Sequence, residues 1–400
     1  MPRAVVVLPS NTYRAADFIE AAESLGVELV VASENPSPID MGDRYVTIDC
    51  SDPMAAAETI VAHGDNGPID AVIAADDQGV LVAANASAKL GLAGNSPEAA
   101  ALTRDKLAMR TRLRASEVDQ PEFAELPPDD PVDRVVRRVG FPMVIKPRDR
   151  SASQGVIRVD HPDEVVPAAA RIRSIVGTDA TLLMESFVPG FEIAIEGLID
   201  AGDLDVLAVF DKPDTSSGPY FPETIFVTPS RLPEKALAEA ERVAASAVRA
   251  LGLTHGPVHI ELKVDGTRAR IIEVAARSIG GLCSRSLNFG LMGTSLETLI
   301  LRNALGATKP ELRRESVASG VLMVPTPGAG TVSGFAGEAE TRSIEGVTGI
   351  DFTVTPGDRV VPPPEGDRYL GFVYARAPTP GQVEAALRRA QEEIEVQLEG

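Results

Sequence analysis

The first 95 residues of the chain repeat one order, in which a short apolar run is followed by a helical pattern. Runs typical of buried strands lie at residues 4–9, 27–33 and 70–76. Helical patterns lie at residues 14–25 and 79–92. Parallel strands need such crossovers, so this order predicts a small parallel α/β domain. The first turn carries no G-x-G-x-x-G, which removes the main support for a dinucleotide-binding domain.

Length and charge narrow the class of protein. The 400 residues suffice for about two to three domains. The net charge of −20, with no block of Lys and Arg, would repel a polyphosphate backbone, so we expect no nucleic acid partner. No apolar run approaches the ~20 residues that span a bilayer, and the N-terminal apolar stretch is too short for a secretory signal. We therefore expect a cytoplasmic protein without a membrane partner.

Residues 98–186 are predicted to form a second unit. An amphipathic helix from about 100 to 120 leads into a Pro- and Asp-rich connector. The elements expected after it are strands at 141–147, 156–159 and 181–186, a polar loop at 148–155 and a helix at 162–176.

Two further units are predicted at residues 187–310 and 311–400. The first contains a loop of about twenty residues at 211–231, and ordered loops of that length are often functional. A mobile surface insertion is the alternative. The second alternates short strands with one final helix, and we expect it to be a separate α+β unit.

A lysine at the end of an apolar strand indicates an anionic partner. An unpaired ammonium at Lys146 would cost several kcal/mol if the strand end is buried. The loop that follows offers hydroxyl and backbone N–H groups to a phosphate, from Ser151, Ser153, Gln154 and Gly155. The alternative is an edge lysine whose stem lies over a solvated loop.

Two carboxylates flank an Asp265-Gly266 turn, and the loop length decides whether they meet. A two-residue turn would place Glu261 and Glu273 on opposite faces of the strand pair. A three-residue loop through Thr267, or another odd length, would place them diagonally on one face, ~7–8 Å apart. We predict the odd length, because paired carboxylates suit Mg²⁺ that bridges nucleotide phosphates. The alternative is an exposed hairpin whose acids pair with neighbouring basic residues.

Arg277 follows the second carboxylate and leads into Gly280 and Gly281. A guanidinium can bind a carboxylate or a phosphoryl group through two hydrogen bonds, and glycines let the backbone approach a ligand. The alternative is a surface arginine at a helix entry. Cys283 has no nucleophile–base partner nearby, so we predict a small buried residue.

Five segments in this order resemble the ATP-grasp superfamily over residues 100–305: TRDKLAMR, IKPRDRSASQGV, MESFVPGFE, HIELKV and IIEVAARSIGG. The resemblance implies a two-lobed domain that binds ATP with Mg²⁺, or with Mn²⁺ in its place. It implies Glu261 and Glu273 as metal ligands. It further implies that the segment from Glu185 to Val188 holds the adenine and that Glu192 binds the ribose. The nucleotide-binding residues implied are Lys106, Lys146, Ser151, Ser153, Gln154, Gly155, Glu185, Ser186, Phe187, Val188 and Glu192.

Within that superfamily the chain is most similar to the L-amino acid ligases, which make dipeptides and related amides. PYFPETIFVTPS (219–230) resembles their substrate loop, and the resemblance implies that Glu223 binds an amino group. The implied substrate contacts are Glu223, His259, Arg277, Gly280 and Gly281. The implied catalytic residues are Arg277, Lys146 and Ser153.

One residue departs from the family pattern. Ala275 stands two residues after the second metal-binding glutamate, where many ATP-grasp enzymes have Asn, and this removes a potential metal ligand.

The resemblance implies an α/β and α+β multidomain fold. Its parts are an N-terminal parallel α/β domain (1–97), a two-lobed ATP-grasp domain (98–186 and 187–310) and a C-terminal α+β domain (311–400). The implied activity joins a small-molecule carboxylate to an amine through an acyl phosphate, and related enzymes are often homodimers. Two alternatives stay open. One is a ligase or carboxylase for a non-amino-acid carboxylate, and the other is a protein that binds ATP without turnover.

Overall fold

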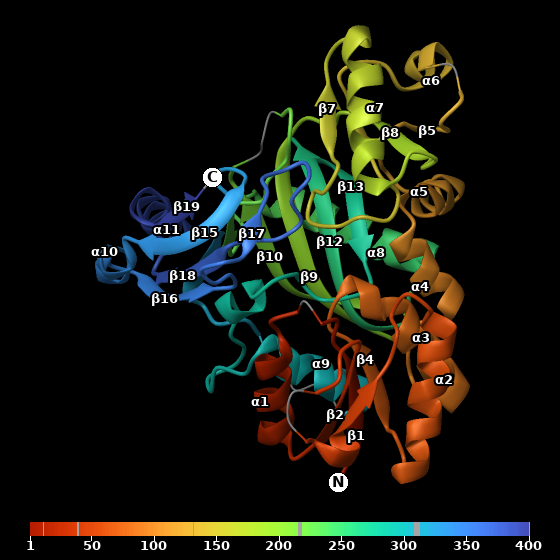
Figure 1. Ribbon diagram of the computed structural model, residues 1–400, viewed down its shortest axis with the longest axis vertical. Coiled ribbons are helices and arrows are strands. Elements are labelled where there is room, and N and C mark those ends of the chain that lie inside the picture. Colours follow the sequence, from red (N-terminus) through yellow and green to blue (C-terminus); the bar gives the residue numbers. More distant parts are fainter. Residues whose placement is uncertain (11, 38–39, 131, 215–217, 308–312, 400) are drawn as a thin grey trace.

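A computed structural model of the chain shows an N-terminal domain, a small upper lobe and a large central sheet stacked along the longest axis (Figure 1). The structure describes residues 1–10, 12–37, 40–130, 132–214, 218–307 and 313–399. Among these residues, no helix is both long and apolar enough to cross a membrane.

The N-terminal domain confirms the parallel α/β prediction. Its strands pair in parallel in the order β3-β2-β1-β4, with bounds β1 (Arg3–Val7), β2 (Glu28–Ser33), β3 (Tyr45–Thr47) and β4 (Ala71–Ala74). The helices are α1 (Ala15–Leu25), α2 (Pro53–His63) and α3 (Val80–Leu90). Every residue of β1 is buried, as expected for a parallel strand covered on both faces.

The helix predicted from about 100 to 120 is two helices, α4 (Pro97–Arg104) and α5 (Lys106–Ala115). The break lies at Asp105, whose backbone is extended and whose carboxylate accepts hydrogen bonds from the N–H groups of Leu107 and Ala108. Asp105 therefore caps the N-terminus of α5, and a capping residue ends the continuous helix that the periodicity predicted.

The upper lobe is an antiparallel sheet in the order β5-β8-β6-β7. Its strands are β5 (Phe123–Leu126), β6 (Met143–Lys146), β7 (Ile157–Val159) and β8 (Leu182–Ser186), and its helices are α6 (Val132–Val139) and α7 (Pro162–Val176). The connector expected in front of β6 thus contains a strand and a helix. Strand β5 is an edge strand of this sheet, and its residues Phe123, Ala124 and Leu126 are buried where it pairs with β8.

The central sheet has eight antiparallel strands in the order β13-β12-β9-β10-β11-β14-β18-β16. Five of them come from the predicted second lobe: β9 (Phe191–Asp200), β10 (Asp203–Lys212), β11 (Ile225–Thr228), β12 (His255–Asp265) and β13 (Arg268–Ala275). Helices α8 (Glu234–Leu251) and α9 (Leu296–Ala304) belong to the same part. The predicted loop at 211–231 is therefore shorter, because its buried end pairs as β11 with β14.

The C-terminal segment is α+β in content, and its strands belong to two sheets, the central sheet and a three-stranded sheet in the order β17-β15-β19. Its strands β14 (Ala318–Met323), β18 (Gly371–Ala377) and β16 (Val347–Phe352) extend the central sheet, which removes the exposed edge that β11 would present. The remaining elements are β15 (Gly330–Ala336), β17 (Arg359–Val360), β19 (Glu395–Glu399), α10 (Glu338–Ser343) and α11 (Pro380–Glu393). The final helix ends at Glu393, and β19 follows it.

The β12–β13 hairpin corrects the predicted loop length. Asp265 pairs with Arg268, so the connection has two residues and the odd length is wrong. A register shift follows, in which Leu262 pairs with Ile271 but Glu261 pairs with Glu273. Ile272 is thus the extra residue of a β-bulge. The bulge brings the two carboxylates onto one face, a result that the predicted loop would have reached by another route.

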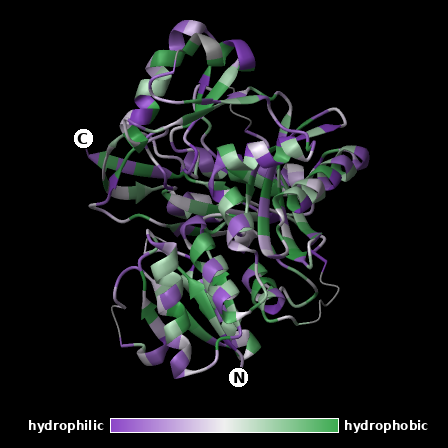
Figure 2. Cartoon of the chain, turned by 90° about the vertical axis from the view of Figure 1, so that its right-hand side faces the viewer, coloured by the Kyte–Doolittle hydropathy of each residue, from purple (hydrophilic) through white to green (hydrophobic). Residues whose placement is uncertain are grey.

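A buried ion pair joins the N-terminal domain to α9. The Arg14 guanidinium lies 2.8 Å from the Glu297 carboxylate and donates a second hydrogen bond to the Ala75 carbonyl. The Arg14 guanidinium lies over the ring of Phe18, which belongs to a hydrophobic core that also contains Ile73 and Leu299. Apolar segments run through the strands of both parts, while polar residues follow the outer faces of the helices (Figure 2).

Removal of the Arg14 charge alone should destabilise the fold by about 3–5 kcal/mol, because the Arg14→Leu variant leaves Glu297 buried without its partner. Double substitution with Glu297→Leu should restore much of this loss. Urea unfolding followed by far-UV circular dichroism measures both effects. The exposed pair Lys89–Glu58 supplies the control, since Lys89→Leu should cost less than about 1 kcal/mol. A single variant no less stable than the double variant would contradict the prediction.

Candidate active site

A cavity of about 750 Å³ lies where the N-terminal domain, the upper lobe, the central sheet and the C-terminal segment meet. The predicted site residues that line it are Lys106, Lys146, Ser151, Ser153, Gln154, Glu185, Ser186, Phe187, Val188, Glu192, Glu223, His259, Glu261, Glu273, Arg277, Gly280 and Gly281. Gly155 is not part of the lining, and its N–H donates to the Pro364 carbonyl at 2.8 Å. Residues far apart in the sequence therefore share one space.

A buried carboxylate with two cations occupies the back of the cavity. Glu185 on β8 accepts from Arg110 Nε at 2.6 Å and lies 2.7 Å from Lys146 Nζ. Burial alone would raise the pKa of Glu185, but the two cations lower it to about 2. Burial lowers the pKa of Lys146 from its usual value. Lys146 is thus a buried lysine with an anionic partner, and the edge-lysine alternative is wrong.

In the segment expected to hold adenine, two backbone N–H groups already form hydrogen bonds within the protein. The Ser186 and Phe187 N–H groups donate to the carbonyls of Glu122 and Pro142. The Glu185 side chain is occupied by its cations. A base bound along this segment would therefore have to use other backbone groups.

Lys106 at the start of α5 connects the phosphate-loop region to the central sheet. Its Nζ donates to the Arg150 carbonyl at 2.6 Å and lies 3.1 Å from Glu273 Oε1. In the same loop, Ala152 and Ser153 have positive φ angles of 51° and 56°, which turns this segment sharply. Lys106, one of the implied nucleotide-binding lysines, and Glu273, one of the predicted metal ligands, are therefore direct neighbours.

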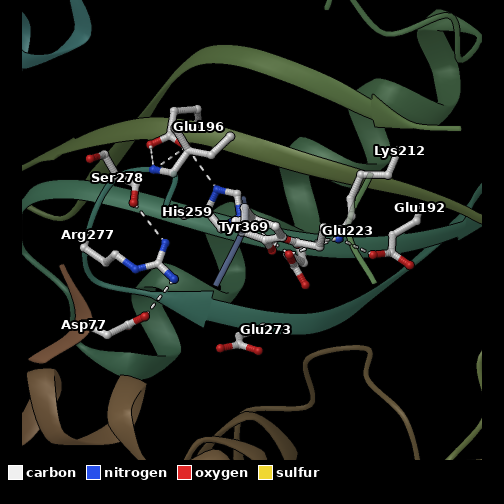
Figure 3. A network of polar contacts seen from close by, with 12 residues as sticks. Asp77, Glu192, Glu196, Lys212, Glu223, His259, Glu273, Arg277, Ser278 and Tyr369 are labelled. Carbon is white, nitrogen blue, oxygen red and sulfur yellow. Dashed lines mark hydrogen bonds and ion pairs between the residues drawn. The ribbon is translucent and has the colours of Figure 1, made fainter. Parts of the chain in front are cut away.

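Lys212 at the end of β10 lies among three carboxylates. Its Nζ is 2.5 Å from Glu192, 3.0 Å from Glu223 and 3.1 Å from Glu261. Burial would lower the pKa of Lys212, but these acids raise it well above its usual value. Figure 3 shows Lys212 between Glu192 and Glu223. Glu192, the predicted ribose ligand, also pairs with Lys263 at 2.7 Å.

Glu223, the predicted amine ligand, has a second partner from the C-terminal segment. The Tyr369 hydroxyl donates to Glu223 Oε2. Burial and the neighbouring Glu223 charge raise the pKa of Tyr369 well above its usual value. Glu223 is thus fixed by Lys212 on one oxygen and Tyr369 on the other.

His259 lies between two acids on the floor of the cavity. Its Nδ1 is 3.0 Å from Glu196, and its Nε2 is 3.6 Å from Glu261. Burial would lower the pKa of His259, but hydrogen bonds to these carboxylates raise it to about 9. Glu196 also accepts the Ile279 N–H at 2.9 Å, which fixes the backbone that leads into the glycine pair.

Arg277 is buried, so the surface-arginine alternative is wrong. Its guanidinium donates to Asp77 at 2.8 Å and to the Ser278 carbonyl at 2.9 Å (Figure 3). Asp77 comes from the N-terminal domain and also pairs with Arg104 at 2.8 Å. Burial would raise the pKa of Asp77, but Arg277 and Arg104 hold it well below the usual range. Cys283 is buried, as predicted.

Glu261 and Glu273 are the pair that fits a hard divalent cation. They are direct cross-strand neighbours on the face that lines the cavity. Ala275 pairs with His259 and offers no side-chain ligand. Across the described residues, no group of three or more His, Cys, Asp or Glu side chains has a metal-binding arrangement. Two carboxylates nevertheless fit Mg²⁺, because it is commonly held by one or two carboxylates together with substrate phosphates.

Several residues that orient this site were not predicted from the sequence, among them Asp77, Arg110, Lys212 and Tyr369. Two of them carried a usable signal. Arg110 lies four residues after Lys106 and so shares its helix face. Lys212 ends an apolar strand, as Lys146 does. Asp77 and Tyr369 reach the site only through contacts between distant segments.

Three family models match the chain. An ATP-grasp N-terminal domain model matches residues 19–94, an ATP-grasp domain model matches residues 139–286, and an L-amino acid ligase C-terminal domain 2 model matches residues 322–399. A solved L-amino acid ligase from Bacillus licheniformis has the same fold, with a TM-score of 0.83 and 24% identity over 100% of this chain and 99% of that one.

Curated relatives are distant. The uncharacterized protein y4rH of Sinorhizobium fredii is 25% identical over 99% of this chain and 83% of its own length. The alanine–anticapsin ligase of Bacillus subtilis is 26% identical over 56% of this chain, and the match spans about half of that ligase, 51%. Together, these domain models show that the chain belongs to the ATP-grasp superfamily.

Proposed function

We propose that the chain is an ATP- and Mg²⁺-dependent ligase that joins the carboxylate of one amino acid, or amino acid-like acid, to the amine of another. A carboxylate oxygen bonds to the γ-phosphorus of ATP as the bond to ADP breaks, and the amine nitrogen then displaces phosphate from the acyl phosphate. The observation that carries the proposal is a single cavity in which Glu261 and Glu273 face a set of buried cations: Lys106, Lys146, Lys212 and Arg277. The cytoplasmic location and the homodimer remain expectations.

The cations give the cavity its affinity for phosphate. Lys106, Lys146 and Lys212 come from three elements, and each is held by a carboxylate in the same cavity. Fixed charges of this kind stabilise negative charge that develops during phosphoryl transfer without reorganising at that moment. When bound, Mg²⁺ would neutralise phosphate charge and polarise the transferred group, and Glu261 and Glu273 would hold it.

The phosphate loop and the C-terminal segment are joined by hydrogen bonds at the cavity, where closure of this loop would exclude water. The Gln154 side chain donates to the Glu365 carbonyl at 2.9 Å, next to the hydrogen bond from the Gly155 N–H to the Pro364 carbonyl. Exclusion of water protects an acyl phosphate from hydrolysis. No side chain needs to form a covalent bond with substrate in this reaction.

The substrate end lies between Glu223 and Arg277. The Glu223 carboxylate would receive a substrate ammonium group, and Tyr369 keeps it oriented. The Arg277 guanidinium, fixed by Asp77, would bind the reacting carboxylate or the acyl phosphate. Gly280 and Gly281 lie beside it, and their backbone can approach the substrate closely.

Phosphate release from Mg·ATP against single and paired amino acids tests the proposal. Release that requires two amino acids, with a product one water lighter than their sum by mass spectrometry, would establish ligation and identify both substrates. Phosphate release with a non-amino-acid carboxylate would support the ATP-dependent ligase reaction but refute the proposed specificity for amino acids. ATP binding without release across broad panels would reject the ligase and favour a protein that binds ATP without turnover.

Substitutions in the cation–carboxylate set should abolish most turnover. We expect Lys146→Met and Glu273→Gln each to lower the rate of ADP formation by about 100-fold or more. Lys146→Met removes a positive charge that would face the phosphates, and Glu273→Gln removes a carboxylate that would hold Mg²⁺. A coupled ADP assay measures the rate. The control is Lys89→Met, an exposed lysine outside the cavity. Unchanged ADP formation in either variant would refute the proposed roles.

Loss of the Tyr369 hydroxyl should weaken amine recognition and leave nucleotide binding intact. In Tyr369→Phe, Glu223 keeps Lys212 but loses its second hydrogen bond, so KM for the amine substrate should rise about tenfold while KM for ATP is unchanged. Steady-state kinetics with the pair found in the panel measure both constants. Tyr45→Phe is the matched control, because the Tyr45 hydroxyl bonds to the Asn35 carbonyl in the N-terminal domain. Equal changes in both constants would contradict the prediction.

A further inference from the structure

The β-bulge at Ile272 decides where Glu273 points. On the turn side of the bulge, Leu262 pairs with Ile271, and a regular continuation would pair Glu261 with Ile272 and Ile260 with Glu273. Ile260 is fully buried in the core that includes α8, so that register would direct Glu273 away from the cavity. With the bulge, Ile272 and Glu273 both line the cavity, and Glu273 lies opposite Glu261.

In a regular strand the carbonyls of consecutive residues point in opposite directions, but at this bulge on the edge strand β13 one side chain contacts two consecutive carbonyls. Arg110 Nη1 donates to the Ile271 carbonyl at 2.9 Å, and Arg110 Nη2 donates to the Ile272 carbonyl at 2.6 Å. The Arg110 side chain is 0% exposed. A buried carbonyl without a donor is costly, so these bonds favour the bulged strand over a regular one.

We propose that Arg110 is a positioning residue of the metal site: it holds the Ile272 bulge and thereby keeps Glu273 facing Glu261. The inference rests on the proposed function in taking these two carboxylates as the metal ligands. Arg110 touches neither of them. It acts through the backbone of β13, whose turn-side carbonyls it fixes from α5.

The geometry requires an arginine. Arg110 uses Nε for Glu185 and its two terminal nitrogens for the two carbonyls, and Nη1 also donates to Gln120 Oε1 at 3.4 Å, so one planar group makes four contacts in different directions. A lysine ammonium could keep the charge beside Glu185, but it has no rigid fork to hold both carbonyls. Lys106, one helical turn earlier on α5, contacts Glu273 itself. Helix α5 thus acts on both the bulge and the carboxylate that follows it.

The test compares Arg110→Lys with Arg114→Lys. Arg114 lies one turn later on α5, and its guanidinium stacks on Phe123 and donates to the Phe123 carbonyl, away from β13. Electron paramagnetic resonance with free Mn²⁺ measures Mn²⁺ affinity in the presence of ADP. Fluorescence of trinitrophenyl-ADP without metal measures nucleotide affinity. Circular dichroism confirms that each variant is folded, and Arg110→Gln replaces Arg110→Lys if the lysine variant does not fold.

We expect Arg110→Lys to raise the Mn²⁺ dissociation constant about tenfold, because loss of a residue that orients a metal ligand typically weakens metal binding by at least that factor. The nucleotide affinity without metal should stay close to that of the wild type. Arg114→Lys should change neither. A folded variant with wild-type Mn²⁺ affinity, or one that loses nucleotide affinity as strongly as metal affinity, would overturn the inference. A wild-type protein that binds no Mn²⁺ with ADP would instead overturn the proposed function, and the metal role of Arg110 with it.

Discussion

Charge compensation between buried side chains from different parts of the chain holds the cavity in shape. Asp77 of the N-terminal domain pairs with Arg277 at the end of the central sheet, and Glu185 of the upper lobe pairs with Arg110 of α5. An unpaired buried charge costs several kcal/mol, so each pair fixes the distance between two parts of the fold. The N-terminal domain and the upper lobe are therefore tied at the cavity to their neighbouring elements, and one of these groups, Arg277, would also bind the anionic substrate.

The sequence could predict the elements whose patterns are local. Strand periodicity located β1, β6 and β8, and a lysine at the end of β6 correctly indicated a buried anionic partner. The bulge could not be predicted, because one extra residue leaves the alternation on either side unchanged and shows only in the pairing. Strand β5 was hidden in a Pro- and Asp-rich connector, and its partner β8 lies more than fifty residues away.

The same limit applies to the site. Lysines and acids next to recognisable strands were identified, whereas the residues that orient them were not. Asp77 follows β4, yet its role depends on Arg277, which lies 200 residues away. Arg110 shares a helix face with Lys106, but the sequence does not say that a bulged strand lies opposite that face. Residues that bind a ligand carry motifs, and residues that position them depend on the tertiary fold.

The C-terminal segment contacts both ends of the cavity, the phosphate loop and the substrate end. At the phosphate loop, the Pro364 carbonyl accepts the Gly155 N–H and the Glu365 carbonyl accepts the Gln154 side chain. At the substrate end, the Tyr369 hydroxyl donates to Glu223. Only a few residues separate these contacts, so the positions of the two ends are linked covalently. Its strands β14, β18 and β16 extend the central sheet, which gives this link a rigid base. A shift of the phosphate loop must then strain either this link or the Glu223 contact.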